Sequence, residues 1–268
     1  MISCEFHGRL GNNMFQIAVA ASMAKKLNTD FSVPTYTLAG HRGSMPSDLS
    51  GFEYPYNYKS DNETKHHNKI GEKDNQYTEL PLQDEIKLCG FFQSSKYFND
   101  VRDDLINKYF NPTNWVVNVA KKYNIGSNSL GICVRRGDYL MLQHNHCVLS
   151  SDYYQAAITD LCLKHTIDSI FVFSDDLNWC KEVFDDINST FVNEEKFVQL
   201  YMMTQMKHII LANSTFSWWG AYLNNKGGEV YFPDPWYGTN NQNIDVSGLI
   251  LPSWTVMKHN IVFDPTPA

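Results

Sequence analysis

The chain has 268 residues, of which 43% are hydrophobic and 14% aromatic, a composition that excludes a largely disordered protein. Its formal net charge of −7 argues against nucleic acid or an acidic membrane surface as the main partner. No apolar run reaches the ~20 residues of a bilayer span, and the first residues lack the layout of a signal peptide. We therefore expect a cytoplasmic enzyme of about two domains.

Six cysteines are spread along the chain without a C-x-x-C pair, and most lie within or beside apolar runs. Buried free thiols in a reducing compartment explain this usage best. His144, His146 and Cys147 lie close together, but they lack a partner cluster of ligands. We therefore expect no metal.

The N-terminal half begins with a strand at residues 2–6, followed by the turn GRLGNN and a helix with an apolar face. Gly8 and Gly11 permit close approach of a ligand to the backbone, and Arg9 and Asn12 offer hydrogen-bond donors. A plain strand-to-helix turn explains the same residues without a ligand.

Residues 34–84 are polar and lack periodicity, which predicts a long loop, and a strand follows at 85–92. The polar segment 123–128 predicts a boundary between domains. We expect an N-terminal domain at 1–125 and a C-terminal domain at 126–268.

Apolar runs alternate with helices through the C-terminal half. The expected strands are 130–135, 169–174 and 208–213, with shorter ones at 229–232 and 249–251, and the expected helices are 152–165 and 175–186. This alternation predicts a parallel sheet covered on both faces, a Rossmann-like domain without a G-x-G-x-x-G signature.

Two adjacent arginines, Arg135 and Arg136, and then Asp138 follow the strand 130–135. Ligands bind outside the carboxyl ends of strands in open α/β sheets, and an arginine presents a rigid fork of donors to a diphosphate. We expect one arginine to pair with Asp138 or an acidic neighbour and the other to meet the ligand. A solvated turn is the alternative interpretation.

The segment HIILANSTFSWWGAYL predicts a buried strand, a polar turn at Asn213, Ser214 and Thr215, and a helix that begins near Phe216 or Ser217. The dipole and N–H groups at a helix start attract anions, so a phosphate is expected there. Helix capping by Ser214 and Thr215, with packing of the two tryptophans, is the alternative. We expect the polar turns of both halves to converge on one ligand.

Six collinear segments together resemble the α-1,2-fucosyltransferases of glycosyltransferase family 11. They are GRLGNNMFQIA, CGFFQSSKYF, CVRRGDY, CVLSSDYYQAAI, FVFSDDLNWCKE and MKHIILANSTFSWWGAYL. The resemblance implies an α/β fold of GT-B type, with two Rossmann-like domains facing across a cleft. It further implies GDP-fucose as donor, a galactose-terminated glycan as acceptor, inversion at the fucosyl carbon and no metal. Peripheral contact with the cytoplasmic face of a membrane is also implied.

The resemblance assigns roles to the polar turns. Arg135 is the expected catalytic contact to the leaving diphosphate, and Arg136 is expected to orient it or to hold the fold. Asn12, with Arg9, is expected to approach the reacting centre as a catalytic residue. Asp138, the third catalytic candidate, is expected to fix the arginines or the hydroxyls of the donor. The expected donor-binding residues are Arg9, Arg135, Arg136, Ser174, Asp175, Asp176, Asn213, Ser214, Thr215, Phe216 and Ser217. The general base stays open among Glu5, His7 and Asp138, and transfer to phosphate or water is a further alternative.

This sequence departs from the family pattern at two positions. Cys133 stands where H-x-R-R has histidine, which puts donor affinity in question, and Asn13 stands where many members have glutamine. Two rivals are a fucosyltransferase of other linkage or donor and a non-catalytic sugar-nucleotide or glycan-binding protein of the same fold. A general nucleotide-binding domain would need a glycine-rich fingerprint or a P-loop, which this sequence lacks.

Overall fold

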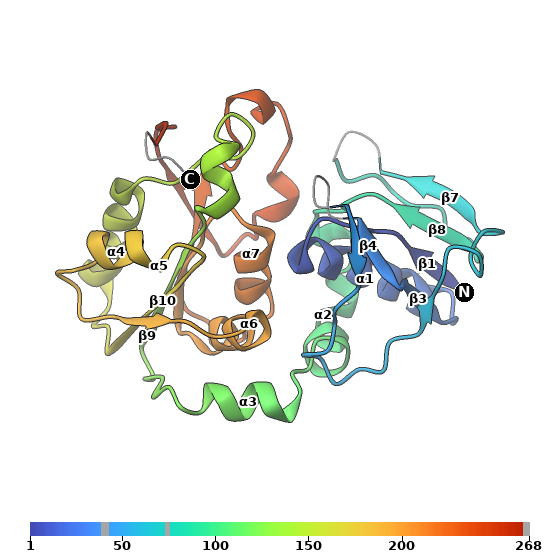
Figure 1. The fold of residues 1–268 in the computed structure, drawn as a ribbon, viewed down its shortest axis with the longest axis horizontal. Coiled ribbons are helices and arrows are strands. Elements are labelled where there is room, and N and C mark those ends of the chain that lie inside the picture. Colours follow the sequence, from blue (N-terminus) through green and yellow to red (C-terminus); the bar gives the residue numbers. More distant parts are fainter. Residues whose placement is uncertain (39–42, 73–75, 265–268) are drawn as a thin grey trace. The chain divides into compact units, whose positions relative to one another are not determined.

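The computed structural model describes residues 1–38, 43–72 and 76–264. It divides into two compact units: unit 1 comprises Met1–Thr113 and Ile244–Leu249, and unit 2 comprises Asn114–Asn243 and Ile250–Ala268 (Figure 1). Compared with the division predicted at residue 125, helix α3 (Asn114–Ala120) lies in unit 2 and a short later segment lies in unit 1.

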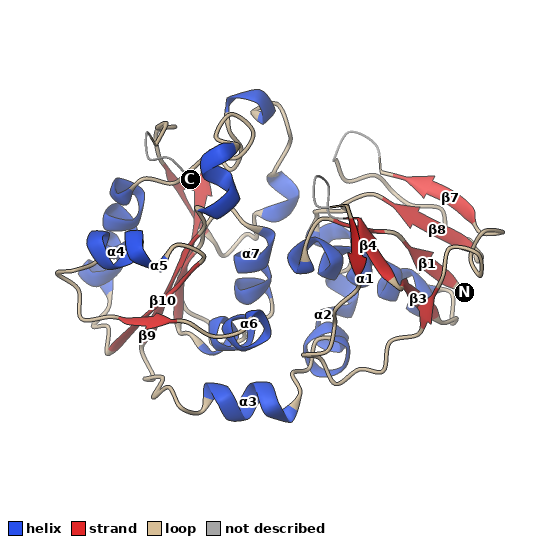
Figure 2. Ribbon diagram, viewed as in Figure 1, coloured by secondary structure: helices blue, strands red, loops and turns tan. Residues whose placement is uncertain are grey.

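Unit 1 contains a five-stranded sheet of order β6-β3-β1-β8-β7 in which all neighbouring strands are parallel. The strands are β1 (Ile2–Cys4), β3 (Phe31–Pro34), β6 (Tyr58–Lys59), β7 (Asn68–Gly71) and β8 (Ile86–Cys89). Helix α1 (Leu10–Lys26) packs against β1 and β3 (Figure 2). Its predicted apolar face is buried, at Met14, Ile17, Ala18, Ala21 and Ala24.

A second, small sheet joins β2 (Phe6–His7) to β4 (Tyr36–Leu38) in parallel and β4 to β5 (Ser44–Pro46) in antiparallel. The segment 34–84, predicted as one loop, therefore holds the short strands β4, β5, β6 and β7. That prediction was wrong because strands of two to four residues with largely exposed side chains leave no apolar alternation to detect.

Residues 95–109 form a series of short helical turns in unit 1. These are 3-10 turns at Ser95–Tyr97 and Asn99–Val101, α2 (Arg102–Asp104) and a π-helical turn at Leu105–Tyr109.

Unit 2 contains a six-stranded, fully parallel sheet of order β11-β10-β9-β12-β13-β14. The strands are β9 (Ser129–Val134), β10 (Ser169–Ser174), β11 (Thr190–Val192), β12 (His208–Ile210), β13 (Val230–Asp234) and β14 (Thr255–Lys258). Counted within the unit, this is the Rossmann order 3-2-1-4-5-6, and the sequence order reverses between β9 and β12.

Four helices of unit 2 cover both faces of this sheet, as predicted. They are α4 (Ser151–Lys164), α5 (Leu177–Val183), α6 (Lys196–Gln205) and α7 (Thr215–Tyr222). Figure 1 shows α4 and α5 on one side of the strands and α6 and α7 on the other. A 3-10 turn at Ser247–Leu249 replaces the strand expected at 249–251. None of the helices in the described ranges combines the length and apolar character that crossing a bilayer demands.

Candidate functional site

Three polar segments follow β9, β10 and β12 at their carboxyl ends, on either side of the point where the strand order reverses. They contain Arg135 to Asp138, Ser174 to Asp176, and Asn213 to Ser217. Because β9 lies between β10 and β12 in one parallel sheet, all three segments reach the same edge. This edge is where open α/β sheets bind ligands, so unit 2 brings these predicted donor-side residues together.

Arg135 lies at this edge with a side chain that is 20% exposed. It forms ion pairs with Asp138 and, at 2.6 Å, with Asp175, and it lies 5.3 Å above the ring of Tyr139. Each carboxylate contacts a different terminal nitrogen, so the guanidinium is held in one orientation while the side chain keeps some exposure to solvent. A positively charged group fixed in this way suits binding of a phosphate.

Arg136 is only 1% exposed and serves the fold. Its Nε donates to Asp176 at 3.0 Å, its Nη1 lies 2.8 Å from Asp264, and its guanidinium stacks 4.3 Å from the ring of Trp179. The expectation that one arginine would lack an acidic partner is therefore wrong. The two arginines together have four carboxylate partners from three segments of the chain, namely Asp138, Asp175, Asp176 and Asp264. A buried guanidinium such as that of Arg136 requires partners of this kind.

The two aspartates after β10 fix the loop that carries the arginines. Asp175 accepts a hydrogen bond from the backbone N–H of Arg136 at 2.9 Å. A side chain at Gly137 would place its Cβ 2.2 Å from Asp175 Oδ2, so any larger residue there would displace this carboxylate. Asp176 caps α5 by accepting from the backbone N–H of Trp179 at 3.1 Å, and Ser174 Oγ accepts from the N–H of Asp176 at 2.9 Å.

The turn between β12 and α7 divides into buried and accessible residues. Asn213 is buried and donates to the carbonyls of Cys147 and Trp236 at 2.7 and 2.8 Å. Ser217 is buried and donates to backbone carbonyls at 2.9 and 3.0 Å, so both residues hold the turn in shape. Ser214 caps α7 through the N–H of Phe216, and α7 begins at Thr215. Ser214, Thr215 and Phe216 are partly exposed at the helix start.

Tyr139, which the sequence reasoning missed, links the first and third segments. Its hydroxyl donates to the carbonyl of Asn213 at 3.1 Å, and its ring stacks on His146 at 4.4 Å. Its other ring contact is Arg135. Burial lowers the pKa of His146, which favours the neutral ring beside this arginine. The aromatic residue directly after R-R-G-D was the sequence signal that could have identified Tyr139. The pairing of Arg136 with Asp264 had no signal in the sequence.

The GRLGNN turn belongs to unit 1. Gly8 has a φ of +82°, and Arg9 is exposed immediately before α1. Asn12 is partly exposed, and its Oδ1 accepts from Nε2 of Gln93 at 3.1 Å. The departure at Asn13 is structural, because this buried amide donates to the carbonyl of His7 at 3.3 Å.

Cys133 lies buried in β9, and burial raises the pKa of its thiol well above the usual range. The other five cysteines are likewise free thiols. Cys133 is therefore an unreactive core residue. Its side chain is buried and does not line the edge of the sheet that carries Arg135.

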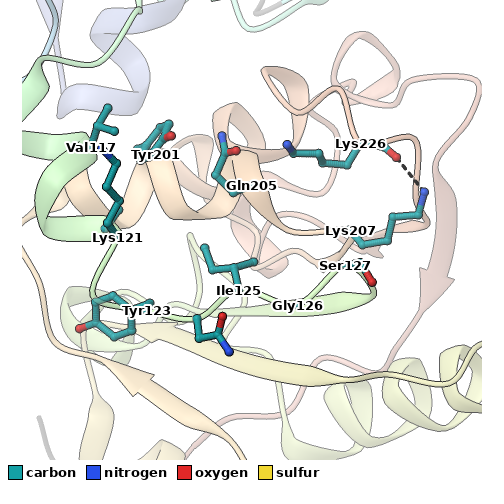
Figure 3. A pocket seen from close by; sticks show the side chains of 12 residues that line it. Val117, Lys121, Tyr123, Ile125, Gly126, Ser127, Tyr201, Gln205, Lys207 and Lys226 are labelled. Carbon is teal, nitrogen blue, oxygen red and sulfur yellow. Dashed lines mark hydrogen bonds between the residues drawn. The ribbon is translucent and has the colours of Figure 1, made fainter.

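A hollow of about 590 Å³ in unit 2 lies away from these residues, at the amino ends of β9, β12 and β13 (Figure 3). Lys121, Tyr123, Ser127, Lys207 and Lys226 are among its lining residues. None of the predicted site residues lines it, so it is separate from the edge that carries Arg135.

The family model for glycosyl transferase family 11 matches residues 53–258. The chain belongs to this family. It is therefore a glycosyltransferase-family protein, and the predicted resemblance is confirmed.

The relatives of this family 11 protein are named for different transferase activities. An alpha-1,2-colitosyltransferase from Escherichia coli is 32% identical over 169 residues, which span 58% of each chain. The O-antigen biosynthesis glycosyltransferase WbnK from Escherichia coli is 29% identical, covering 95% of this chain and 99% of its own. A putative galactoside 2-alpha-L-fucosyltransferase, svh-11, from Caenorhabditis elegans is 30% identical, covering 93% and 76%.

Among solved structures, POFUT1 in complex with GDP matches this glycosyltransferase with a TM-score of 0.54 and 12% identity. The match covers 83% of this chain and 93% of that one. The apo form of POFUT1 matches with a TM-score of 0.52. At this identity the likeness concerns the fold, and it confirms the predicted α/β class.

Proposed function

We propose that this protein is an inverting α-1,2-fucosyltransferase that transfers L-fucose from GDP-β-L-fucose to a hydroxyl of a terminal galactoside. The observation that carries the proposal is Arg135, a partly exposed guanidinium held by two carboxylates at the reversal point of a Rossmann-type sheet. Family membership supports sugar transfer, and the named relatives include α-1,2-fucosyltransferases.

The proposed chemistry places the diphosphate of the donor between Arg135 and the start of α7. As the bond between fucosyl C1 and the β-phosphate oxygen breaks, negative charge grows on that phosphate. A guanidinium already in place stabilises this transition state more than the ground state. The helix dipole and the partly exposed Ser214 and Thr215 favour the same anion.

The acceptor oxygen attacks C1 from the face opposite the diphosphate, so the β-linked donor gives an α-fucoside and GDP leaves with the bonding electrons. Side chains take the role that a metal has in many other transferases, and we propose a metal-independent reaction on that basis. We further propose that unit 1 receives the acceptor, with Asn12 and Arg9 as the candidate contact residues of that unit.

A second donor is favoured by one finding. The relative of 32% identity is named an alpha-1,2-colitosyltransferase, and colitose is L-fucose without its 3-hydroxyl. The same arginine and helix start serve either diphosphate, so donor choice depends on contacts to the sugar. The WbnK relative, named for O-antigen biosynthesis, supports a surface saccharide as acceptor, and we propose that the enzyme works at the cytoplasmic face of a membrane.

The test measures GDP release in EDTA from GDP-fucose and GDP-colitose, with and without galactose-terminated acceptors. Release that requires an acceptor supports a metal-independent transferase, and the preferred donor decides between the two candidates. Absence of release from either donor, despite GDP binding, would instead support the non-catalytic binding protein. A release rate that falls in EDTA and recovers with Mg²⁺ would refute the metal-independent mechanism.

A further inference from the structure

Unit 1 contains a carboxylate–imidazole pair at the carboxyl end of its own parallel sheet. His7 Nε2 lies 3.2 Å from Glu5 Oε2, and both side chains are partly exposed. Glu5 directly follows β1, the central strand, and His7 ends β2. A glutamate hydrogen-bonded to one ring nitrogen fixes the tautomer and leaves the other nitrogen as the proton acceptor.

Lys69 and His7 favour the ionised form of Glu5, and a second lysine lies nearby. Lys69 Nζ lies 3.0 Å from Glu5 Oε1, and the buried Lys87 lies 3.9 Å from the same oxygen. Burial acts to raise the pKa of Glu5, but hydrogen bonds from Lys69 and His7 outweigh it and hold that pKa below its usual value. Lys87 is itself anchored by Asp61 at 2.6 Å. An ionised Glu5 is suited to stabilise an imidazolium at His7.

The backbone around His7 is rigid because of the fully buried Gln16. Its Oε1 accepts from the N–H of His7 at 3.2 Å, and its Nε2 donates to the carbonyl of Gly90 at 2.8 Å. Gln16 therefore joins β2 to the segment that follows β8.

That segment after β8 presents an aromatic surface beside the imidazole. Phe91 is 37% exposed, and its ring makes an edge contact with His7 at 6.2 Å between centroids. Both Phe91 and Phe92 donate their backbone N–H to the Glu72 carboxylate, at 2.8 and 2.9 Å. An exposed phenyl ring held by its backbone offers an apolar platform, and the C–H face of a sugar ring is complementary to it.

We infer that Phe91 and the Glu5–His7 pair form the acceptor-sugar subsite, with His7 as the group that takes the proton from the attacking hydroxyl. This rests on the proposed function. The hydroxyl proton moves to His7 Nδ1, the acceptor oxygen bonds to C1, and the diphosphate leaves with the electrons of the broken C1–O bond. Asp138, the other candidate base, is ion-paired with Arg135 and serves that arginine.

The first test compares His7→Gln with His66→Gln, a change at an exposed histidine of the same unit. His7→Gln should lower kcat by ~10²–10³ and remove the acid limb of the pH profile, in line with loss of a general base. GDP affinity and Tm should stay at their wild-type values. Glu5→Gln should have a smaller effect of roughly ten-fold on kcat. Wild-type turnover with an unchanged pH profile in His7→Gln would overturn the assignment of the base.

The second test measures sugar binding without turnover. Saturation-transfer NMR with methyl β-galactoside should detect binding to the wild-type enzyme, and Phe91→Ala should lose it while Tyr58→Ala, a change at another exposed ring, keeps it. In kinetics, Phe91→Ala should raise KM for the acceptor at least ten-fold with little change in kcat. Unchanged galactoside binding in Phe91→Ala would refute the subsite. A wild-type protein that binds galactosides and releases no GDP would refute the proposed reaction while keeping the subsite.

Discussion

Alanine replacements of Arg135 and Arg136 should affect different properties of the enzyme, because the two guanidinium groups differ in burial. Arg136→Ala removes the partner of two carboxylates, and breaking a buried ion pair costs about 3–5 kcal/mol. Asp176 and Asp264 keep 27% and 18% exposure, so the lower end, about 3 kcal/mol, applies. At about 2–4 °C per kcal/mol for a domain of this size, the Tm should fall by roughly 6–12 °C.

Arg135→Ala should have the opposite profile. Its partners Asp138 and Asp175 are 24% and 26% exposed, so the lost pairs contribute about 1 kcal/mol or less to stability. Loss of the guanidinium opposite the leaving phosphate should lower turnover by ~10²–10³.

Thermal unfolding and GDP release measured on the same preparations separate the two effects. Lys122→Ala, at an exposed cation of unit 2, serves as the control and should change neither quantity. The reasoning fails if Arg135→Ala keeps wild-type turnover. It also fails if Arg136→Ala leaves the Tm unchanged.

Three further predictions concern residues of unit 2. Tyr139→Leu should lower turnover roughly five-fold more than Tyr139→Phe. Only leucine removes the ring beneath Arg135, and that contact contributes about 1 kcal/mol. Equal rates for the two variants would contradict this role. Gly137→Ala should lower turnover by roughly 10²-fold in the GDP-release assay, because its Cβ displaces Asp175; an alanine enzyme with unchanged kinetics would show that the carboxylate position is unimportant. Burial, with His165 and Lys207 adding, lowers the pKa of His208 to about 4, so below about pH 6.5 the unfolded chain binds a proton that the folded chain does not. Stability should therefore fall as the pH drops from about 6.5 to 4, and the Tm of His208→Gln should fall less steeply over that range.

The local sequence contained most of the information about unit 2. Apolar runs of five or six residues, each followed at once by polar side chains, predicted β9, β10 and β12 and the three segments at their ends. This succeeded because an apolar run and the polar residues directly after it are local features of the sequence. The same approach failed in residues 34–84, where very short strands are stabilised by pairing with distant partners and by no pattern of their own.

The sequence by itself determined the candidate residues: an arginine pair after a buried strand, and a hydroxyl-rich turn before a helix. Which arginine stays partly exposed was decided only by the tertiary structure, since Asp264 is far from Arg136 in sequence and pairs with it beside Trp179. The placement of Phe91 beside His7 likewise depends on Gln16 bridging two strands that are far apart in sequence. Residue type and spacing report local chemistry, whereas burial and ion pairing arise from segments that meet only when the chain folds.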